Sequence, residues 1–177
     1  MAGSKSNLPI DRLHAVVDEL AAPIKIRHAE RLKCRLGCSA CCVDDLTVFE
    51  VEAETIRLHY PDLLTHEAPH PTGACAFLDS ADGCRIYPHR PYVCRTQGLP
   101  LRWVEEGNNG EPVEYRDICP LNEEGPDIAS LPAEACWSIG PVEQKLAEMQ
   151  GRKDGGEERR IALRDLFDHK DIVLSCE

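Results

Sequence analysis

The chain has 177 residues, a formal net charge of −11 and ten cysteines. Such an excess of acidic side chains argues against binding to nucleic acid or to an anionic membrane, because both need a basic face. No apolar run approaches the roughly 18 residues of a membrane span, and the N-terminal residues lack the apolar stretch of a secretory signal. We therefore expect a cytoplasmic protein with no nucleic-acid partner and no membrane partner.

The N-terminal residues predict a helical arm. Their apolar positions recur with the period of one helical face: Ile10, Leu13, Val16, Val17 and Leu20. Pro9 suits the first turn of a helix. We expect Pro23 to break or kink this helix, with a second helical piece running toward Leu32.

Two further elements are predicted after the arm. Leu46, Thr47 and Val48 indicate a short strand because of their apolar and β-branched side chains. Residues 50–59 predict a helix, which Pro61 closes.

The middle of the chain predicts two β-hairpins. The first joins residues 75–79 to 84–87 through an Asp-Gly turn, and the second joins residues 99–105 to 112–117 through an Asn-Asn-Gly turn. Between them, residues 89–94 indicate a short helical turn. Toward the C-terminus, residues 141–150 and 157–169 predict two amphipathic helices, and these should cover the core.

The cysteines are strongly clustered. Four fall within nine residues, Cys-Arg-Leu-Gly-Cys-Ser-Ala-Cys-Cys at 34–42. In a reducing compartment such thiols serve more often as metal ligands or redox groups than as disulfides. A tetrahedral metal site takes four soft ligands at about 2.3 Å from one ion. Cysteines two or three residues apart can reach one ion across a tight turn, which Gly37 and Ser39 favour.

Eight cysteines are the candidate metal ligands: Cys34, Cys38, Cys41, Cys42, Cys75, Cys84, Cys94 and Cys119. Neighbours in an extended chain point to opposite sides, so Cys41 and Cys42 would face two ions or two edges of one cluster. Eight ligands suit two four-ligand sites, or one iron–sulfur cluster with spare thiols, and the sequence leaves the division open. We interpret Cys136 and Cys176 as small buried side chains.

Several other side chains lie near these cysteines in sequence. The guanidinium groups of Arg35, Arg85, Arg90 and Arg95 could donate hydrogen bonds to ligand sulfurs, or could pair with surface carboxylates. His89 is the best substitute ligand among the histidines, because it lies between two cysteines. Four histidines are interpreted as ordinary helix-surface residues: His14, His28, His59 and His169.

Three separated segments of the chain, 34–42, 73–79 and 83–95, resemble the YkgJ-type cysteine-cluster family. These bacterial domains are named for a CxxCxxCC motif and are described as zinc- or iron-chelating; in this chain the first gap is three residues. The resemblance covers roughly residues 30–120 and implies metal binding by the eight cysteines. A similar domain occurs in a flagellin lysine methylase, which suggests by analogy an accessory role in protein modification.

The predicted function is a metal-binding cysteine-cluster protein that is not an enzyme. It would carry zinc in one or two sites with a structural, storage or transfer role, because soft thiolates suit zinc and no catalytic motif is present. A partner protein would serve the transfer role. The first alternative is an iron–sulfur protein that transfers electrons or assists a methylation-type enzyme. The second alternative is a thiol-redox protein.

A radical S-adenosylmethionine enzyme is a weaker interpretation of the same cysteines. The spacing of Cys34, Cys38 and Cys41 fits the cluster motif of those enzymes. However, Ala40 replaces the usual aromatic residue, and the chain lacks the repeated strand–helix units of their barrel.

The predicted fold class is α+β, with a small irregular metal-stabilised core and short β-hairpins between N- and C-terminal helices. We expect one globular unit in three segments: a helical arm at 1–33, a metal-binding domain at 34–120 and a C-terminal helical region at 121–177. A structural zinc contributes about 10–16 kcal/mol of binding free energy, whereas a whole domain is stable by about 5–15 kcal/mol. Without metal, the middle third should therefore be unfolded or molten.

Overall fold

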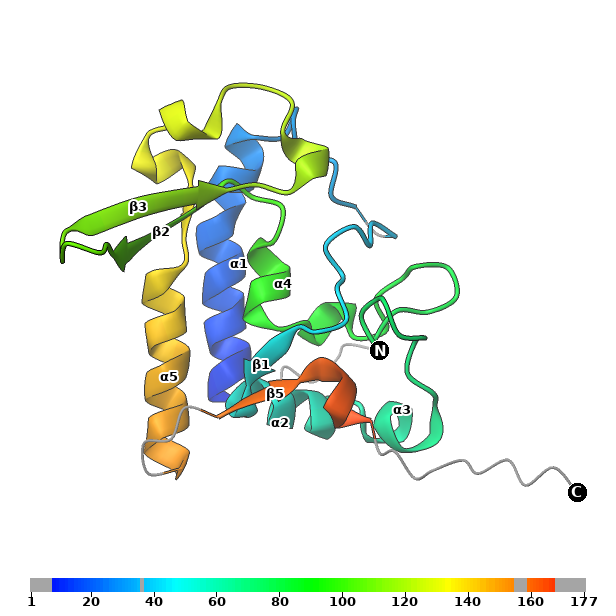
Figure 1. Cartoon of the computed structure of the whole chain (residues 1–177). Coiled ribbons are helices and arrows are strands. Elements are labelled where there is room, and N and C mark those ends of the chain that lie inside the picture. Colours follow the sequence, from blue (N-terminus) through cyan, green and yellow to red (C-terminus); the bar gives the residue numbers. More distant parts are fainter. Residues whose placement is uncertain (1–7, 36, 155–158, 168–177) are drawn as a thin grey trace, which may run out of the picture.

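The computed structural model describes residues 8–35, 37–154 and 159–167. They form a mixed α+β fold, which confirms the predicted class (Figure 1). The α-helices are α1 (Pro9–Arg27), α2 (Glu50–His59), α3 (Pro61–His66), α4 (Tyr92–Thr96) and α5 (Gly140–Asp154). The strands are β1 (Thr47–Phe49), β2 (Leu101–Glu106), β3 (Pro112–Asp117), β4 (Trp137–Ser138) and β5 (Arg160–Ala162). Short 3-10 turns are η1 (Tyr87–His89), η2 (Pro120–Asn122), η3 (Ile128–Ser130), η4 (Ala133–Ala135) and η5 (Leu163–Leu166).

Helix α1 runs through Pro23 and ends at Arg27, so the predicted break and second helical piece are wrong. Pro23 cannot donate a hydrogen bond to the carbonyl of Glu19, but both residues are exposed and water can satisfy that carbonyl. The buried face also differs from the prediction, because it contains His14 and leaves Leu20 57% exposed.

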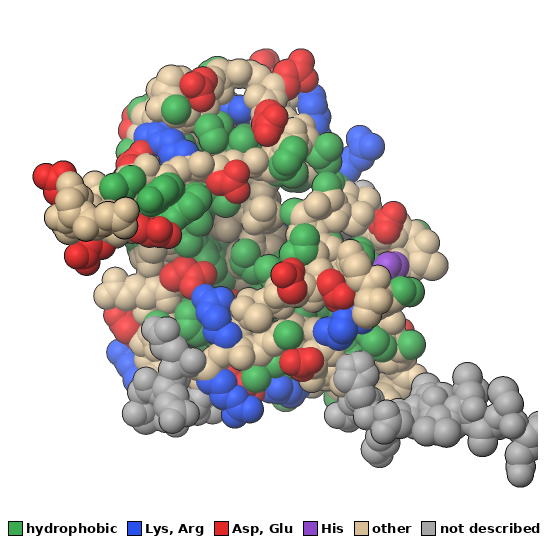
Figure 2. Space-filling model, viewed as in Figure 1, with side chains coloured by type: hydrophobic (Ala, Val, Ile, Leu, Met, Phe, Trp, Pro, Cys, Tyr) green, Lys and Arg blue, Asp and Glu red, His purple; other side chains and the backbone are tan. Residues whose placement is uncertain are grey.

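The second predicted hairpin is confirmed, because β2 and β3 pair antiparallel. It projects from the body of the molecule, and Val104, Val113 and Tyr115 on it stay exposed (Figures 1 and 2). The first predicted hairpin is wrong as a pair of strands. It consists of one isolated bridge between Leu78 and Cys84, because the chain turns back over only five intervening residues.

The predicted helix at residues 157–169 is also wrong in its described part, which forms β5 and the turn η5. Strand β5 pairs antiparallel with β1, and Ile161 stands opposite Val48. The residues at 157–158 and 168–169 lie outside the described range. Pairing with β1 makes this segment a strand. The spacing of apolar residues within the segment cannot reveal a pairing partner that lies far along the chain.

Two hydrophobic clusters form the interior. The first, which we call the helical core, joins α1, α4, α5 and β2 and contains no cysteine among its described members. The second, the cysteine-side core, joins α2, β1, residues 75–86 and residues 161–167. Figure 1 shows α1, α4 and α5 side by side, with the cysteine-bearing loops next to them. Of the helices in the described residues, none combines the length and apolar composition needed to cross a bilayer.

Candidate metal centre

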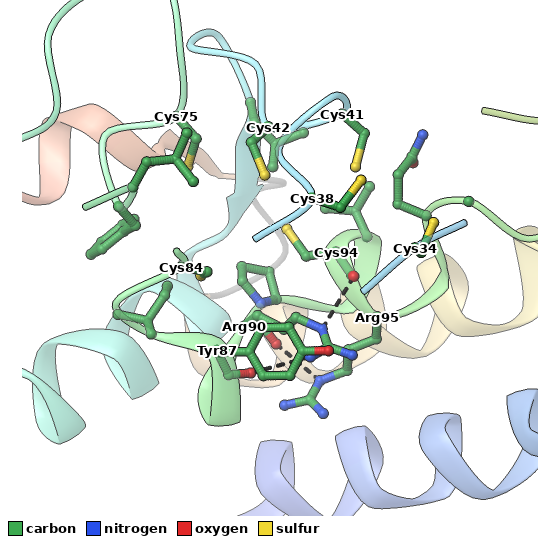
Figure 3. Close-up of a pocket in the computed structure, with 18 of the residues that line it drawn as sticks. Cys34, Cys38, Cys41, Cys42, Cys75, Cys84, Tyr87, Arg90, Cys94 and Arg95 are labelled. Carbon is green, nitrogen blue, oxygen red and sulfur yellow. Dashed lines mark hydrogen bonds between the residues drawn. The ribbon is translucent and has the colours of Figure 1, made fainter. Parts of the chain in front are cut away.

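Seven of the eight candidate cysteines line one cavity of about 350 Å³. Their side chains come from separate loops and from α4, and they converge on a shared space (Figure 3). The lining cysteines are Cys34, Cys38, Cys41, Cys42, Cys75, Cys84 and Cys94. Across the residues described, no three cysteine, histidine or acidic side chains are already arranged to hold a single metal ion. The cysteines therefore surround a common space without closing on one point.

The predicted knuckle at 34–42 consists of two successive tight turns. The amide of Cys38 donates to the carbonyl of Arg35 at 2.9 Å, and the amide of Cys42 donates to the carbonyl of Ser39 at 2.8 Å. Gly37 adopts a φ of 84°, in the left-handed region that favours glycine. These turns agree with the tight turn that the cysteine spacing predicts, and all four cysteines of the knuckle line the cavity.

The loop that carries Cys75 and Cys84 is fixed mainly by its own backbone. The amide of Cys75 donates to the carbonyl of Cys42 at 2.9 Å, which joins this loop to the knuckle. The carboxylate of Asp79 accepts hydrogen bonds from the amides of Ala81 and Gly83, both at 2.8 Å, and so shapes the turn. Cys75 is 8% exposed, whereas Cys84 is half-buried.

Asn122 joins the first and the last of the eight candidate cysteines, Cys34 and Cys119. Its side chain is fully buried, and Nδ2 donates to the sulfur of Cys34 at 3.3 Å and to the carbonyl of Gly98 at 2.8 Å. Its own amide donates to the carbonyl of Cys119 at 2.7 Å, and its Oδ1 accepts from the amide of Lys33. Cys119 is buried, and because Asn122 contacts both residues, Cys119 lies beside the loop of Cys34 rather than in a separate part of the molecule.

Gly98 lies directly against the same sulfur. It has a φ of 93°, and a Cβ atom at this position would stand 2.4 Å from the sulfur of Cys34. A side chain there would push Cys34 out of its place, so this position needs glycine for both conformation and space.

Burial makes most of these thiols hard to ionise without a cation. It raises the pKa of Cys75, Cys84 and Cys94, and neighbouring thiolates raise those of Cys84 and Cys94 further. The pKa of Cys41 is lowered to about 6 because it accepts a hydrogen bond from Cys42, whose own pKa is raised by the same contact. A bound cation would favour the thiolate form at every one of these positions.

The predicted arginines fix the backbone around the cysteines. Arg90 Nε donates to the carbonyl of Cys94 at 3.2 Å, and Arg95 Nε donates to the carbonyl of Arg90 at 2.9 Å. Arg95 also pairs with Asp18 at 2.6 Å. Arg85 Nη2 donates at 2.6 Å to the carbonyl of the residue after Cys75. Hydrogen bonds from these arginines to the sulfurs of bound thiolates stay a prediction for the metal-loaded protein.

The histidines behave differently from the predictions. His89 does not belong to the residues that line the cavity; its ring stacks on His59 at 3.7 Å, and its Nδ1 is 2.8 Å from the hydroxyl of Tyr60. His14 is 3% exposed and is hydrogen-bonded to Glu52 at 3.0 Å, so its assignment to the helix surface is wrong. His28 is also buried. The local helical pattern could not show that α2 and η4 cover these positions.

Arg164 and Asn122 are the structural residues of the site that the sequence analysis missed. Arg164, in η5, pairs with Asp44 beside the knuckle and donates to the carbonyls of His70 at 2.7 Å and Ala74 at 3.0 Å. The C-terminal segment therefore clamps the two loops that carry Cys42 and Cys75. Both residues act over long sequence separations, which no local motif signals. Cys136 is buried away from the cavity, as predicted, and Cys176 lies outside the described residues.

Comparison with known families identifies the region that carries these cysteines. Residues 33–120 match the CxxCxxCC family, described as a putative zinc- or iron-chelating domain. The chain therefore contains a CxxCxxCC domain, which confirms the resemblance and supports metal binding. The match includes all eight candidate cysteines; it ends just before Asn122 and well before Arg164. No curated protein and no solved structure matches the chain.

Proposed function

We propose that this protein binds zinc through its eight clustered cysteine thiolates, in one or two sites with a structural, storage or transfer role. The observation that carries the proposal is the convergence of seven of these cysteines on one cavity, with Cys119 held beside Cys34 through Asn122. Thiolate sulfur is the donor that zinc prefers in closed tetrahedral sites, and the donor set here consists of sulfur. The residues present therefore fit the metal.

The charge of the site explains why a cation would stabilise it. Burial raises the pKa of Cys94, and the nearby thiolates of Cys75 and Cys84 raise it further. Several ionised thiolates in one cavity would repel each other. A divalent cation balances two of the negative charges, and its binding displaces the protons of those ligands that were still thiols. In the described residues, the knuckle at 34–42 has no regular secondary structure that would resist closing on an ion.

An iron–sulfur cluster is the second candidate, and the size of the cavity favours it. The space between the cysteines measures about 350 Å³, and no three described donors already converge on one ion. A cluster of several irons holds its cysteine ligands farther apart than a single zinc ion does, so it would need less movement of the loops. Such a protein would transfer electrons or assist a protein-modification enzyme.

Two further features belong to this proposal. We place the protein in the cytoplasm, because the nine described cysteines are free thiols and a reducing compartment keeps thiols available for metal. We also propose that the helical arm, the cysteine-cluster domain and the C-terminal region form one globular unit. The pairing of β1 with β5 and the clamp from Arg164 to Asp44 support this.

Elemental analysis and visible absorption of protein purified without air test the proposal. We expect zinc in a colourless protein; iron together with broad visible absorption would support the cluster instead, because the filled d shell of zinc gives no colour. The Cys136→Ser variant is the matched control, since this buried cysteine lies outside the cavity and its loss should leave the metal content unchanged. Folded, reduced protein that holds no metal and gains none on reconstitution would overturn the proposal.

A further inference from the structure

Four of the cysteines lie together against the hydrophobic interior. The amide of Cys75 donates to the carbonyl of Cys42, and the bridge between Leu78 and Cys84 holds the third member close to Cys75. Cys75 is part of the cysteine-side core, and Cys42 and Cys84 pack against it. Figure 3 shows the sulfur of Cys94 pointing toward this group from α4. We call these four residues the inner set: Cys42, Cys75, Cys84 and Cys94.

The other four cysteines are grouped around Cys34, and three of them line the opposite side of the cavity. Asn122 contacts the sulfur of Cys34 and the backbone of Cys119, which brings these distant positions together. Figure 3 shows the sulfurs of Cys38 and Cys41 on the side of Cys34. We call these four residues the outer set: Cys34, Cys38, Cys41 and Cys119.

The two sets differ in how firmly the chain holds them. Three members of the outer set lie on residues 34–41, where Cys34 and its neighbours Lys33, Arg35 and Gly37 are exposed. Three members of the inner set, Cys42, Cys75 and Cys84, are carried by segments that pack into the cysteine-side core, and Arg164 holds the loops of Cys42 and Cys75 together. The fourth, Cys94, is on α4, which packs into the helical core. Opening of the outer set needs only a local loop motion, whereas opening of the inner set disturbs the core.

We propose, on the basis of the function proposed above, that the eight cysteines form two separate four-thiolate centres: the inner set holds a structural metal ion, and the outer set holds an ion that exchanges with solution. The adjacent pair Cys41 and Cys42 is the seam between the two centres. One residue of each centre sits on either side of a single peptide bond, and the hydrogen bond between the Cys42 thiol and the Cys41 sulfur places the two centres next to each other. The outer centre is then the one from which metal can be delivered.

Metal content of cysteine variants tests the division. Zinc bound per protein is measured after dialysis against a weak chelator, for the wild type, Cys34→Ser, Cys84→Ser, the within-set double variant C34S/C119S and the cross-set double variant C34S/C84S. We expect two ions in the wild type, one in each single variant, one in C34S/C119S and none in C34S/C84S. Cys136→Ser is the control and should retain two ions. Circular dichroism verifies that the C34S/C119S variant, whose inner set is intact, stays folded.

The rate of metal release tests the difference between the sets. Mixing wild-type protein with an excess of a strong chromogenic chelator should release zinc in two phases of equal amplitude. The fast phase should disappear in C34S/C119S, and the slow phase should persist. One ion in the wild type, loss of both ions in C34S/C119S, or removal of the slow phase by that variant would overturn the division. A wild type that binds no metal at all would instead overturn the function on which the division rests.

Discussion

Gly98→Ala should destabilise the metal-loaded protein and displace Cys34. The new Cβ atom would stand 2.4 Å from the sulfur of Cys34 and 3.2 Å from Nδ2 of Asn122, against the ~3.5–4.0 Å of ordinary contact. Alanine at a φ of 93° costs about 1–2 kcal/mol of conformational strain. Displacing the exposed Cys34 and crowding the buried Asn122 add about 1–3 kcal/mol. Together the free energy of unfolding should fall by about 2–5 kcal/mol.

A second glycine with a positive φ, Gly110, separates the cost of backbone strain from the cost of the steric clash. Gly110 has a φ of 78° in the distant turn between β2 and β3, and its nearest contact for a Cβ atom is 3.7 Å away. Gly110→Ala should therefore cost only the strain, about 1–2 kcal/mol. Thermal unfolding measured by circular dichroism should show Gly98→Ala melting below Gly110→Ala by about 2–12 °C, at roughly 2–4 °C per kcal/mol.

The metal content of the same two variants completes the test. Gly110→Ala should bind as much zinc as the wild type, whereas Gly98→Ala should lose metal because Cys34 no longer reaches its place. Equal melting temperatures together with full metal content in both variants would refute the packing of Cys34 against Gly98, and with it the geometry from which the outer set is argued.

Four further results follow from the structure. Asn122→Ala should lower the free energy of unfolding by about 1–3 kcal/mol, because it leaves buried groups such as the carbonyl of Gly98 without their hydrogen bond. Asn109→Ala, at an exposed position, should change the free energy of unfolding little, and urea unfolding compares the two variants. Arg164→Met should cost about 1.5–3 kcal/mol through lost charged hydrogen bonds. Lys145→Met, which removes an exposed ion pair with Glu148, should cost under about 1 kcal/mol in the same assay. Burial raises the pKa of Cys75, Cys84 and Cys94, so protons compete with metal for these sulfurs. The apparent zinc affinity, measured by chelator competition, should therefore fall as the pH falls from 8 to 6. An affinity that does not change with pH would mean that thiols are not the ligands. Removal of metal by a chelator under reducing conditions should abolish hydrogen-exchange protection at residues 74–86. Helix α1 should keep its protection, because the helical core has no cysteine among its described residues. Equal protection of residues 74–86 with and without metal would contradict this.

Local signals in the sequence predict local structure well here. Helix α2 matches its predicted bounds because Glu50 and Pro61 mark a start and a stop within the segment itself. The hairpin of β2 and β3 follows from two strand patterns around a glycine-containing turn. The tight turns of the knuckle follow equally from Gly37 and the cysteine spacing, because each depends on residues within a few positions of one another.

The features that the sequence did not predict depend on partners far along the chain. Residues 160–162 became a strand because β1 offers an unpaired edge more than a hundred residues away. His14 is buried because α2 brings Glu52 against it. Asn122 and Arg164 have ordinary local surroundings, and only the folded arrangement shows that they hold cysteine-bearing loops. Such long-range contacts have no periodic or motif signal in a single sequence.

The division of the interior into two clusters explains how a chain with irregular cysteine loops can remain ordered. In the helical core, α1, α4 and α5 pack against one another without any described cysteine. This packing holds α4, the helix that carries Cys94, in place. The cysteine-side core packs Cys75 among apolar residues but leaves the knuckle with only short turns to define it. The scaffold therefore positions the inner set firmly and the other cysteines of the knuckle loosely. A metal ion that joins these loops to Cys94 would transmit the rigidity of the helices to the part of the chain that has the least structure of its own.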